Sequence, residues 1–374
     1  MESDSQNRVL AILKVSPPVT GATAINELIL NGCNSWERGT VIFKTVSYAK
    51  DIQDLGSIGF RKFSAFFRLW ISVWMSLIRD KPKLVYIQMS ITGMSFYRDS
   101  TILLLVKLFR KKIMVHLHGK GMKVYANGHF FYRFWMSFIL KNQYAIVLTN
   151  SQKSDVDWIA WNQLFVLANG IEHPPLEKDW EVKSNVFTWM FLSNLLKAKG
   201  IDDVLELART MHQQGKPFRG IIVGKEGDRD AKYVKVFIEQ HGLQNNLEYH
   251  GPLYGLEKWK LLVESDVFLF PTYNEAFGLV GVEAMSVGLP VIAYEEGGLM
   301  DIIKNGHNGF LVPKGDQYEL LSRLEKYMTN PGLAQAHGLA GRRLFFVNFT
   351  SKTFMTRLFQ IWEEVLEYRS IRNA

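Results

Sequence analysis

Residues 267–290, VFLFPTYNEAFGLVGVEAMSVGLP, combine a strand, a loop and a helix in one short stretch. Residues 267–270 are apolar, and Pro271 ends the run, which predicts a short strand. Residues 278–287 have helical composition and are followed by Gly288, which predicts a helix that ends there. In an open α/β sheet, ligands bind where strands end and helices begin. We therefore expect a binding site in the polar loop between these two elements.

The residues around this loop favour a phosphorylated ligand with hydroxyl groups. The free N–H groups of a helix start favour an anion, and Gly278 leaves room for a bulky one. Glu275 and Glu283 flank this point, and an ionised carboxylate accepts strong hydrogen bonds from hydroxyl groups. Taken alone, each is explained as well by an ordinary surface or mid-helix glutamate. Their combination with the Pro and Gly positions favours a nucleotide-sugar pocket, with Glu275 on the hexose and Glu283 on the ribose.

The whole segment carries a specific family resemblance. It combines Pro271, then Glu275-x-Phe-Gly, then Glu283 five positions after the glycine, and continues with Gly-Gly at 297–298 and Asn-Gly at 308–309. This pattern resembles the donor-binding motif of retaining glycosyltransferases with the GT-B fold, of the group 1 or family 4 type. The resemblance implies an α/β protein with two Rossmann-like domains facing a cleft. It also implies a C-terminal helix that crosses back to the first domain.

The length of the chain fits this organisation, since 374 residues are enough for two domains. We place an acceptor-binding domain at residues 1–170, completed by residues 353–374, and a donor-binding domain at residues 171–352. The linker contains two consecutive prolines and four acids within residues 171–183. The single cysteine, Cys33, excludes an internal disulfide and fits a reducing compartment. We expect no secretory signal peptide and a cytoplasmic location.

The positive charge is concentrated in the first domain. The net charge is +8, and residues 1–170 contribute 21 Lys and Arg against 10 Asp and Glu. Residues 60–81, 106–112 and 130–141 each interleave aromatic residues with cations. They contain too many charges for a membrane span. Together they favour peripheral attachment to the inner face of an anionic membrane, although each helix alone could equally pack on a sheet with its charges in solvent.

Two candidate site residues lie in the first domain. A strand at residues 8–14 leads into a loop with Gly21, which the resemblance places near the donor phosphates. A second strand ends at His116-Leu-His118-Gly, and the resemblance implies that His118 contacts the donor sugar while His116 belongs to the core. Two histidines at this spacing could serve a metal, but a site needs at least a third ligand. No Asp, Glu or Cys occurs between Ile102 and Ser154, so we expect no metal site.

The remaining candidates follow strands of the second domain. The family usually carries Arg and, five residues on, Lys, which neutralise the leaving diphosphate. Lys199 matches the Lys, but Asn194 replaces the Arg and brings no charge; either Lys197 compensates or the diphosphate is held differently. Gly224 follows the strand of residues 218–223 and suits either a loop near a base or phosphate, or a plain turn. The helix start at Gly278 and Leu279 supplies backbone N–H groups to the same diphosphate.

Two Asp-x-Asp patterns could instead mark a metal-dependent glycosyltransferase. Asp155-x-Asp157 lies in the helix-like run of residues 151–161, where the helix dipole explains acids near the start. Asp228-x-Asp230 is treated as incidental. We therefore expect a metal-independent enzyme that needs no cofactor beyond its nucleotide-sugar substrate.

The expected function is sugar transfer with retention, from a nucleotide sugar to a lipid-linked or oligosaccharide acceptor in cell-surface polysaccharide synthesis. In this scheme Glu275 orients the sugar, His118 lines its other side, and Lys199 stabilises the departing diphosphate. An epimerase or hydrolase of the same fold is an alternative, as is a non-enzymatic module that binds anionic lipid or nucleic acid. We expect no nucleic-acid partner, because such a module leaves Glu275 and Glu283 unexplained. A dehydrogenase is disfavoured, since no Gly-x-Gly-x-x-Gly opens either half.

Overall fold

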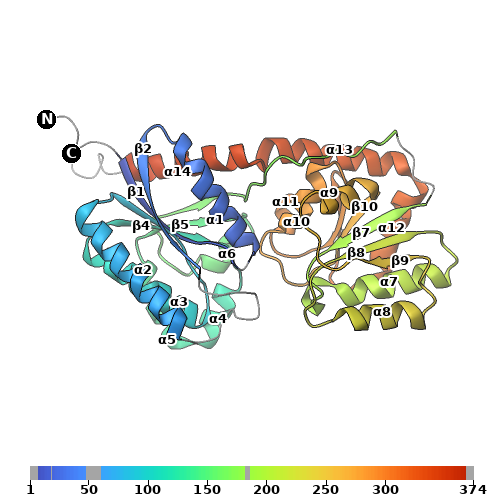
Figure 1. The fold of residues 1–374 in the computed structure, drawn as a ribbon, viewed down its shortest axis with the longest axis horizontal. Helices are drawn as coiled ribbons and strands as arrows, with labels where there is room; N and C mark the ends of the chain where they lie inside the picture. Colours follow the sequence, from blue (N-terminus) through green and yellow to red (C-terminus); the bar gives the residue numbers. More distant parts are fainter. Residues whose placement is uncertain (1–6, 18, 48–59, 182–185, 368–374) are drawn as a thin grey trace. The chain divides into compact units, whose positions relative to one another are not determined.

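The computed structural model describes residues 7–17, 19–47, 60–181 and 186–367, with the side chains of residues 60 and 61 excepted. The chain divides into two α/β units, Met1–Gly170 with Ser351–Ala374, and Ile171–Thr350 (Figure 1). The division after Gly170 lies where the sequence analysis puts it. The chain returns to the first unit at residue 351, two residues before the expected position.

The first unit is built on a parallel six-stranded sheet in the order β2-β1-β3-β4-β5-β6. Its strands are β1 Asn7–Lys14, β2 Gly39–Val46, β3 Leu84–Gln88, β4 Lys112–Leu117, β5 Tyr144–Val147 and β6 Gln163–Val166. Its helices are α1 Gly21–Gly32, η1 Cys33–Ser35, α2 Phe60–Arg79, α3 Gly93–Leu108, α4 Met122–Gly128, α5 Phe130–Leu140, α6 Lys153–Val156 and α14 Ser351–Glu367.

The second unit repeats this architecture with a parallel sheet in the order β12-β11-β10-β7-β8-β9. Its strands are β7 Thr188–Leu192, β8 Arg219–Val223, β9 Leu247–Tyr249, β10 Val267–Phe270, β11 Val291–Tyr294 and β12 Gly309–Val312. Its helices are η2 Lys197–Lys199, α7 Ile201–Gln213, α8 Ala231–Gln240, α9 Gly255–Glu264, α10 Leu279–Ser286, α11 Leu299–Ile302, α12 Gln317–Thr329 and α13 Pro331–Asn348. The expected α/β class with two Rossmann-like domains is confirmed.

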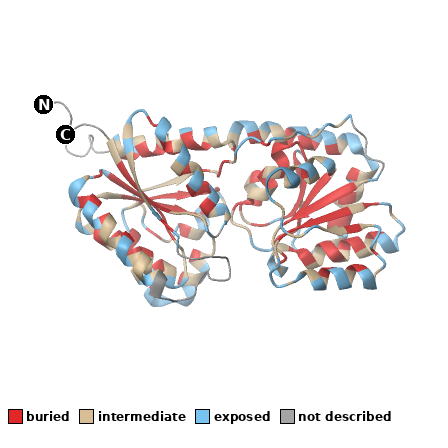
Figure 2. Cartoon of the chain, in the orientation of Figure 1, coloured by how far each residue is buried: buried red, intermediate tan, exposed pale blue. Residues whose placement is uncertain are grey.

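The strands form the core of each unit because helices cover both faces of each sheet. Every residue of β3, β5, β7, β10 and β11 is buried (Figure 2). Strands buried on both faces are nearly continuous apolar runs, which is why residues 267–270 could be recognised from the sequence. One predicted element is wrong in length: only residues 153–156 of the helix-like run at 151–161 form a helix.

The C-terminal helix α14 completes the first unit, as the resemblance implies. The indole N–H of Trp36 donates to Glu363 Oε1 at 3.0 Å, and the Trp36 ring stacks on Phe359 with ring centroids 5.9 Å apart. Phe354 and Trp362 are fully buried on the same helix. The buried apolar side chains of α14 therefore pack on the first unit.

The strand order of each sheet defines a switch point at which consecutive connections leave in opposite directions. In the second unit the chain runs outward from β7 through β8 and β9, then returns to β10 on the other side of β7. In the first unit β2 and β3 lie on opposite sides of β1. Ligands of open α/β sheets bind beyond the carboxyl ends of the strands at such points. The loops after β7 and β10, and those after β1 and β3, are therefore the candidates for function.

Candidate functional site

The loops after β7 and β10 bring Lys199 and Glu275 into contact. Lys199 Nζ lies 2.8 Å from Glu275 Oε2 and donates to the carbonyl of Asn274 at 2.8 Å. The two loops are also joined through the backbone, since the Tyr273 N–H donates to the Ala198 carbonyl at 2.9 Å. The sequence analysis selected Lys199 and Glu275 from different loops, and the structure places them together.

A glycine makes this close approach possible. Gly200 has φ +82°, and a Cβ at this position would lie 2.0 Å from the Pro271 carbonyl oxygen. Any side chain would therefore force the two loops apart, besides straining the left-handed backbone. Gly200 thus positions Lys199 through packing, without offering any chemistry of its own.

The carboxylate of Glu275 is held in one orientation by its neighbours. Its Oε1 accepts from the backbone N–H groups of Ala276 and Phe277 at 3.1 and 3.3 Å. Its own N–H donates to Glu296 Oε1 at 3.2 Å, and Glu296, which is 2% exposed, pairs with Lys314 through Oε2. The sequence analysis missed Glu296 and Lys314; Glu296 precedes the Gly-Gly of the motif and carried no other signal. A carboxylate fixed in this way is preorganised to accept hydrogen bonds.

Helix α10 begins directly beside this carboxylate. Gly278 is its N-cap with φ +100°, and a Cβ there would lie 2.5 Å from Leu299 Cδ2. Within the described residues, no acceptor contacts the backbone N–H groups of Leu279 and Val280. The uncapped start of a helix favours negative charge, so an anion could accept from these two groups.

Glu283 has a protein partner that the sequence analysis did not identify. Lys258 Nζ, on α9, lies 2.8 Å from Glu283 Oε1, and both side chains are mostly buried. Lys258 also lies over the Trp259 ring, 4.6 Å from its centroid. The pairing gives Glu283 a structural reason to be present, alongside its predicted role with a ribose, which stays a prediction.

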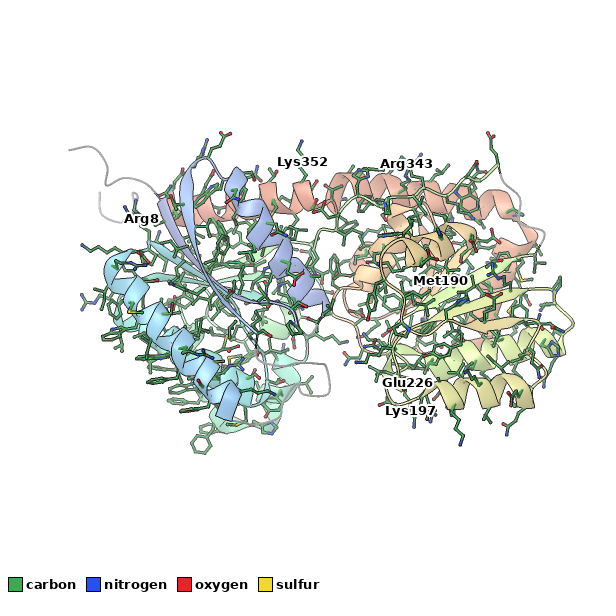
Figure 3. The ribbon with its side chains drawn as sticks, viewed as in Figure 1. Arg8, Met190, Lys197, Glu226, Arg343 and Lys352 are labelled. Carbon is green, nitrogen blue, oxygen red and sulfur yellow. The ribbon has the colours of Figure 1, made fainter. Side chains whose placement is uncertain are left out.

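The remaining candidates of the second unit, Gly224, Asn194 and Lys197, have different surroundings in the structure. A Cβ on Gly224 would lie 1.7 Å from the Ser193 carbonyl oxygen, so this glycine lets the ends of β7 and β8 approach. The half-buried Asn194 side chain has no hydrogen-bond partner among the described residues. Lys197 is exposed and lies with Glu226 at the same edge of the unit (Figure 3). The contribution of Lys197 therefore stays open.

Both Asp-x-Asp patterns have structural roles. Asp155 accepts from the N–H groups of Gly121, Met122 and Lys123 at 2.8 to 2.9 Å and so caps α4, rather than stabilising its own helix as expected. Asp228 accepts from the Lys197 N–H at 3.1 Å, and Asp230 caps α8. No group of three potential metal ligands occurs in the described part of the chain.

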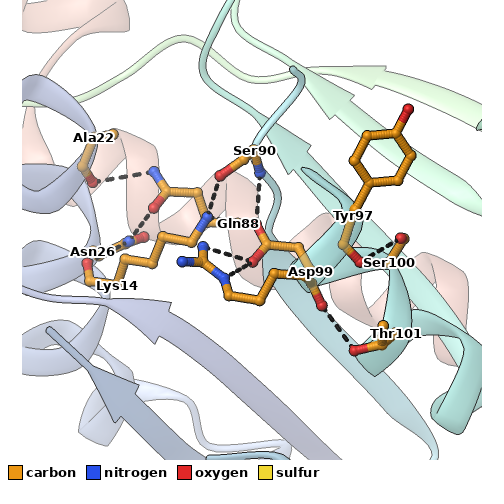
Figure 4. Close-up of polar contacts among 10 residues, drawn as sticks. Lys14, Ala22, Asn26, Gln88, Ser90, Tyr97, Asp99, Ser100 and Thr101 are labelled. Atoms are coloured by element: carbon orange, nitrogen blue, oxygen red, sulfur yellow. Dashed lines mark hydrogen bonds and ion pairs between the residues drawn. The ribbon is translucent and has the colours of Figure 1, made fainter. Parts of the chain in front are cut away.

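At the switch point of the first unit, a buried ion pair follows β1 and β3. Lys14 Nζ, at the end of β1, donates to Asp99 Oδ2 at 2.6 Å and to Ser90 Oγ at 2.7 Å (Figure 4). Asp99 is 2% exposed and also accepts from Arg98 at 2.9 Å. Burial acts to raise the pKa of the Asp99 carboxyl, but the charges of Lys14 and Arg98 outweigh it and lower the pKa. In the sequence, a charged residue at the end of an apolar strand is the feature that could have indicated Lys14, and it is not among the predicted site residues.

The predicted residue His118 lies near this ion pair. Its ring centroid is 4.1 Å from that of His116, whose Nδ1 is 2.6 Å from the Tyr86 hydroxyl. Burial, and then the charge of Lys14, lower the pKa of His118 to about 3. His118 is therefore a neutral imidazole whose buried Nε2 has no hydrogen-bond partner among the described residues. Gly21, the other candidate, is the exposed first residue of α1.

We expect the protein to become less stable as the pH falls, because protonation of His118 is less favourable in the folded state than in the unfolded chain. Its pKa of about 3 lies below the ordinary value of 6.5, so between these values the unfolded chain binds more protons. The contribution of His118 to the free energy of unfolding is fully present above pH 6.5 and is lost as the pH falls toward 3. The free energy of unfolding should drop by about 1 to 2 kcal/mol from this group between pH 7 and pH 5. Urea denaturation should show a smaller drop for His118→Gln; an equal drop would contradict the prediction.

Comparison with known proteins places this geometry in context. Residues 174–344 match the family model described as Glycosyl transferases group 1. The capsular polysaccharide biosynthesis glycosyltransferase CapM of Staphylococcus aureus is 25% identical over 192 residues, which is 50% of this chain and 47% of CapM. The amylovoran biosynthesis glycosyltransferase AmsK of Erwinia amylovora is 33% identical over 139 residues, 36% of this chain and 34% of AmsK. The chain thus spans about half or less of these two curated relatives.

Solved structures are similar over nearly the whole chain. A sucrose-phosphate synthase from Thermosynechococcus elongatus superposes with a TM-score of 0.75 at 14% identity, covering 97% of this chain and all of that protein. Anabaena HepE, in complex with UDP and glucose, superposes with a TM-score of 0.71 at 18% identity, covering 96% of this chain and all of HepE. At these identities the likeness shows the fold alone.

Proposed function

We propose that the chain is a retaining, metal-independent glycosyltransferase, and the match of residues 174–344 to the family model described as Glycosyl transferases group 1 supports this proposal. It moves a sugar from a nucleotide-sugar donor to a saccharide acceptor. One observation carries the proposal: Lys199 and Glu275 are paired beside the uncapped start of α10, at the switch point of the second sheet. A cation, a fixed carboxylate and free N–H groups are what a sugar diphosphate needs from a protein.

In the proposed reaction, the bond between the anomeric carbon and the phosphate oxygen breaks as negative charge grows on the diphosphate. Lys199 and the N–H groups of Leu279 and Val280 stabilise that charge, so the site supplies positive potential without a metal. The acceptor oxygen bonds to the same face of the sugar, and its proton passes to the leaving phosphate. Glu275 accepts hydrogen bonds from the sugar hydroxyls, and Glu283 from the ribose. His118 lines the sugar as a neutral imidazole, and the N–H groups near Gly21 assist the diphosphate.

Relatives and structural neighbours narrow the substrates to be tried first. HepE was solved with UDP, with UDP and glucose, and with UDP-glucose, so UDP-sugars are the first donors to test. CapM and AmsK act in the biosynthesis of capsular polysaccharide and amylovoran, which supports a saccharide acceptor in polysaccharide synthesis. We extend this to an acceptor carried on a lipid, because the first unit is basic and has exposed aromatic side chains.

A donor panel tests the proposal. A donor bound at 100 times its Kd stabilises the fold by about 2.7 kcal/mol, which a thermal shift detects. With the donor identified, release of nucleoside diphosphate should require an acceptor, and NMR of the product should show a retained anomeric configuration. Release without an acceptor would indicate a hydrolase, and a changed donor sugar an epimerase. Binding without turnover of any donor would leave a binding module and overturn the proposal.

The membrane part of the proposal rests on the outer face of α5. Tyr132, Met136, Ile139 and Leu140 bury the inner face of this helix, while Phe130, Phe131, Phe134 and Phe138 are exposed, Phe131 by 81%. The first unit also carries an excess of Lys and Arg. Both its apolar and its basic side chains can therefore attract it to an anionic surface. None of the helices in the described ranges is long and apolar enough to cross a membrane. From the exposed aromatic face of α5 and the basic charge of the first unit, we propose peripheral binding at the cytoplasmic, inner face of a membrane.

We expect the protein to float with vesicles containing anionic lipid at low salt and less so at high salt. Phe130→Ser with Phe131→Ser should weaken binding by more than about tenfold, because each buried phenyl ring contributes roughly 1.5 to 3 kcal/mol. Val236→Ser, which changes an exposed apolar residue on α8 of the second unit, is the control. Failure of the wild-type protein to associate at low salt would end the membrane proposal without affecting sugar transfer.

A further inference from the structure

A basic pocket lies in the first unit at the amino ends of the strands. Lys14 and His118 lie at the carboxyl ends of their strands, on the opposite side of the sheet. The pocket has a volume of about 350 Å³ and opens where β4, β5 and β6 begin. Its lining includes four cations and two exposed amide side chains: Lys107, Arg110, Lys111, Lys112, Asn142 and Asn162. None of the described residues that line it is acidic. None of the roles assigned to the first unit above uses this pocket.

Two of the four cations are occupied by the fold itself. Lys107 Nζ donates to the Phe138 carbonyl at 2.7 Å, and its position in the last turn of α3 also suits the helix dipole. Lys112 Nζ donates to the Val365 carbonyl in the last turns of α14. These contacts explain Lys107 and Lys112 without any ligand.

Arg110 and Lys111 have no such explanation. In the described part of the chain, neither side chain has a hydrogen-bond or ion-pair partner. They follow the end of α3, so they lie outside its last turn and close to two further cations. Placing like charges side by side is unfavourable unless a counter-charge is present. A ligand with negative charge would supply that counter-charge.

The surrounding sequence does not supply it. Residues 102–154 contain nine Lys or Arg and no Asp or Glu. The acid that the structure places at the start of β6, Glu364, already accepts from Gln163 Nε2 at 2.5 Å. The four cations of the lining outnumber this one acid, so the pocket carries an excess of positive charge at neutral pH.

The shape and rim of the pocket indicate the class of ligand. A guanidinium fork and neighbouring amide donors suit the oxygens of a phosphate group, which they can contact by several hydrogen bonds at once. Exposed apolar side chains lie next to the lining residue Lys107: its Nζ is 5.4 Å from the ring centroid of Phe138, which is 52% exposed, and the following residue, Leu108, is 74% exposed. Apolar side chains beside a phosphate pocket fit a molecule that carries both a phosphate and hydrocarbon.

We propose that this pocket binds the phosphate of an anionic lipid headgroup, through Arg110 and Lys111. A soluble phosphate ester has the same phosphate chemistry and is the other possible source of the ligand. The site is separate from the donor residues of the second unit and does not depend on sugar transfer. It adds a specific headgroup contact to the apolar face of α5, whose residue Phe138 contacts the lining residue Lys107.

The test compares the double variant R110Q/K111Q with a matched control, K232Q/K235Q, which removes two exposed cations from α8 of the second unit. One arm measures binding of glycerol 3-phosphate by calorimetry. The other measures cosedimentation with phosphatidylcholine vesicles that contain phosphatidic acid, and with vesicles of equal surface charge that contain phosphatidylserine. Melting temperatures confirm that both variants fold.

We expect R110Q/K111Q to lose binding in the glycerol 3-phosphate arm and to bind phosphatidic acid vesicles about 20- to 30-fold more weakly, with K232Q/K235Q unchanged. The effect on phosphatidylserine vesicles should be smaller. Loss in the soluble arm alone would reject the lipid as the source. If R110Q/K111Q loses binding only to vesicles, and equally for both lipids, the pocket attracts membranes through its charge alone and the specific headgroup site is rejected. Wild-type binding in both arms would overturn the site, and none of these outcomes alters the case for sugar transfer.

Discussion

Replacing Glu275 with alanine should lower kcat/KM for sugar transfer by about 100- to 1,000-fold, as expected for a preorganised group that acts on the transition state. In the structure this carboxylate is held by two backbone N–H groups and by Lys199, so it needs no reorganisation to accept a hydrogen bond. Truncation removes the hydrogen-bond acceptor for the sugar and releases Lys199 from its partner. Initial rates with the donor from the panel measure the change.

Two further variants separate chemistry from folding. Glu275→Gln keeps the size of the side chain and removes its charge, so it should lie between alanine and wild type. Glu295→Ala removes an exposed carboxylate from the loop after β11 and should leave the rate unchanged. If Glu275→Ala keeps the wild-type transfer rate and donor affinity, the role assigned to Glu275 is wrong.

Lys199→Ala should lower the rate by about 100-fold, mainly through kcat, because the charge on the diphosphate is greatest in the transition state. The Lys199 ammonium is held 2.8 Å from both Glu275 Oε2 and the Asn274 carbonyl, so it lies beside the loop between β10 and α10. Lys199→Arg should recover part of the rate, because it restores the charge with a different geometry. Steady-state kinetics of the three proteins measure the effect.

The same series resolves the question raised by Asn194, which brings no charge where the family usually has arginine. Lys197 is exposed, and its backbone N–H is held by Asp228. If Lys197 compensates, Lys197→Ala should cost about as much as Lys199→Ala. A wild-type rate for Lys197→Ala would show that Lys199 and the helix start hold the diphosphate without it. Full activity of Lys199→Ala would refute the assignment of Lys199.

The strands and their order along the chain could be predicted because burial on both faces leaves a local trace. Residues 267–270 are apolar throughout and are followed by Pro271, and both features are visible without any tertiary information. The resemblance also selected Glu275 and Lys199 as candidates, each from its own loop. Their contact could not be derived, because it depends on β7 and β10 being neighbours although 74 residues separate Leu192 from Val267 in the sequence.

From the sequence alone, apolar runs and turn residues indicated the short strands and the linker after residue 170, and the resemblance carried by one motif implied the two-domain α/β fold. Only the tertiary structure decided which side chains meet. Asp155 caps α4, Lys258 pairs with Glu283, and Lys14 pairs with the buried Asp99. The physical reason is that periodicity reports whether a residue faces the core, whereas a contact between loops depends on the order of strands in a sheet. Segments distant in the chain set that order, and no local pattern records it.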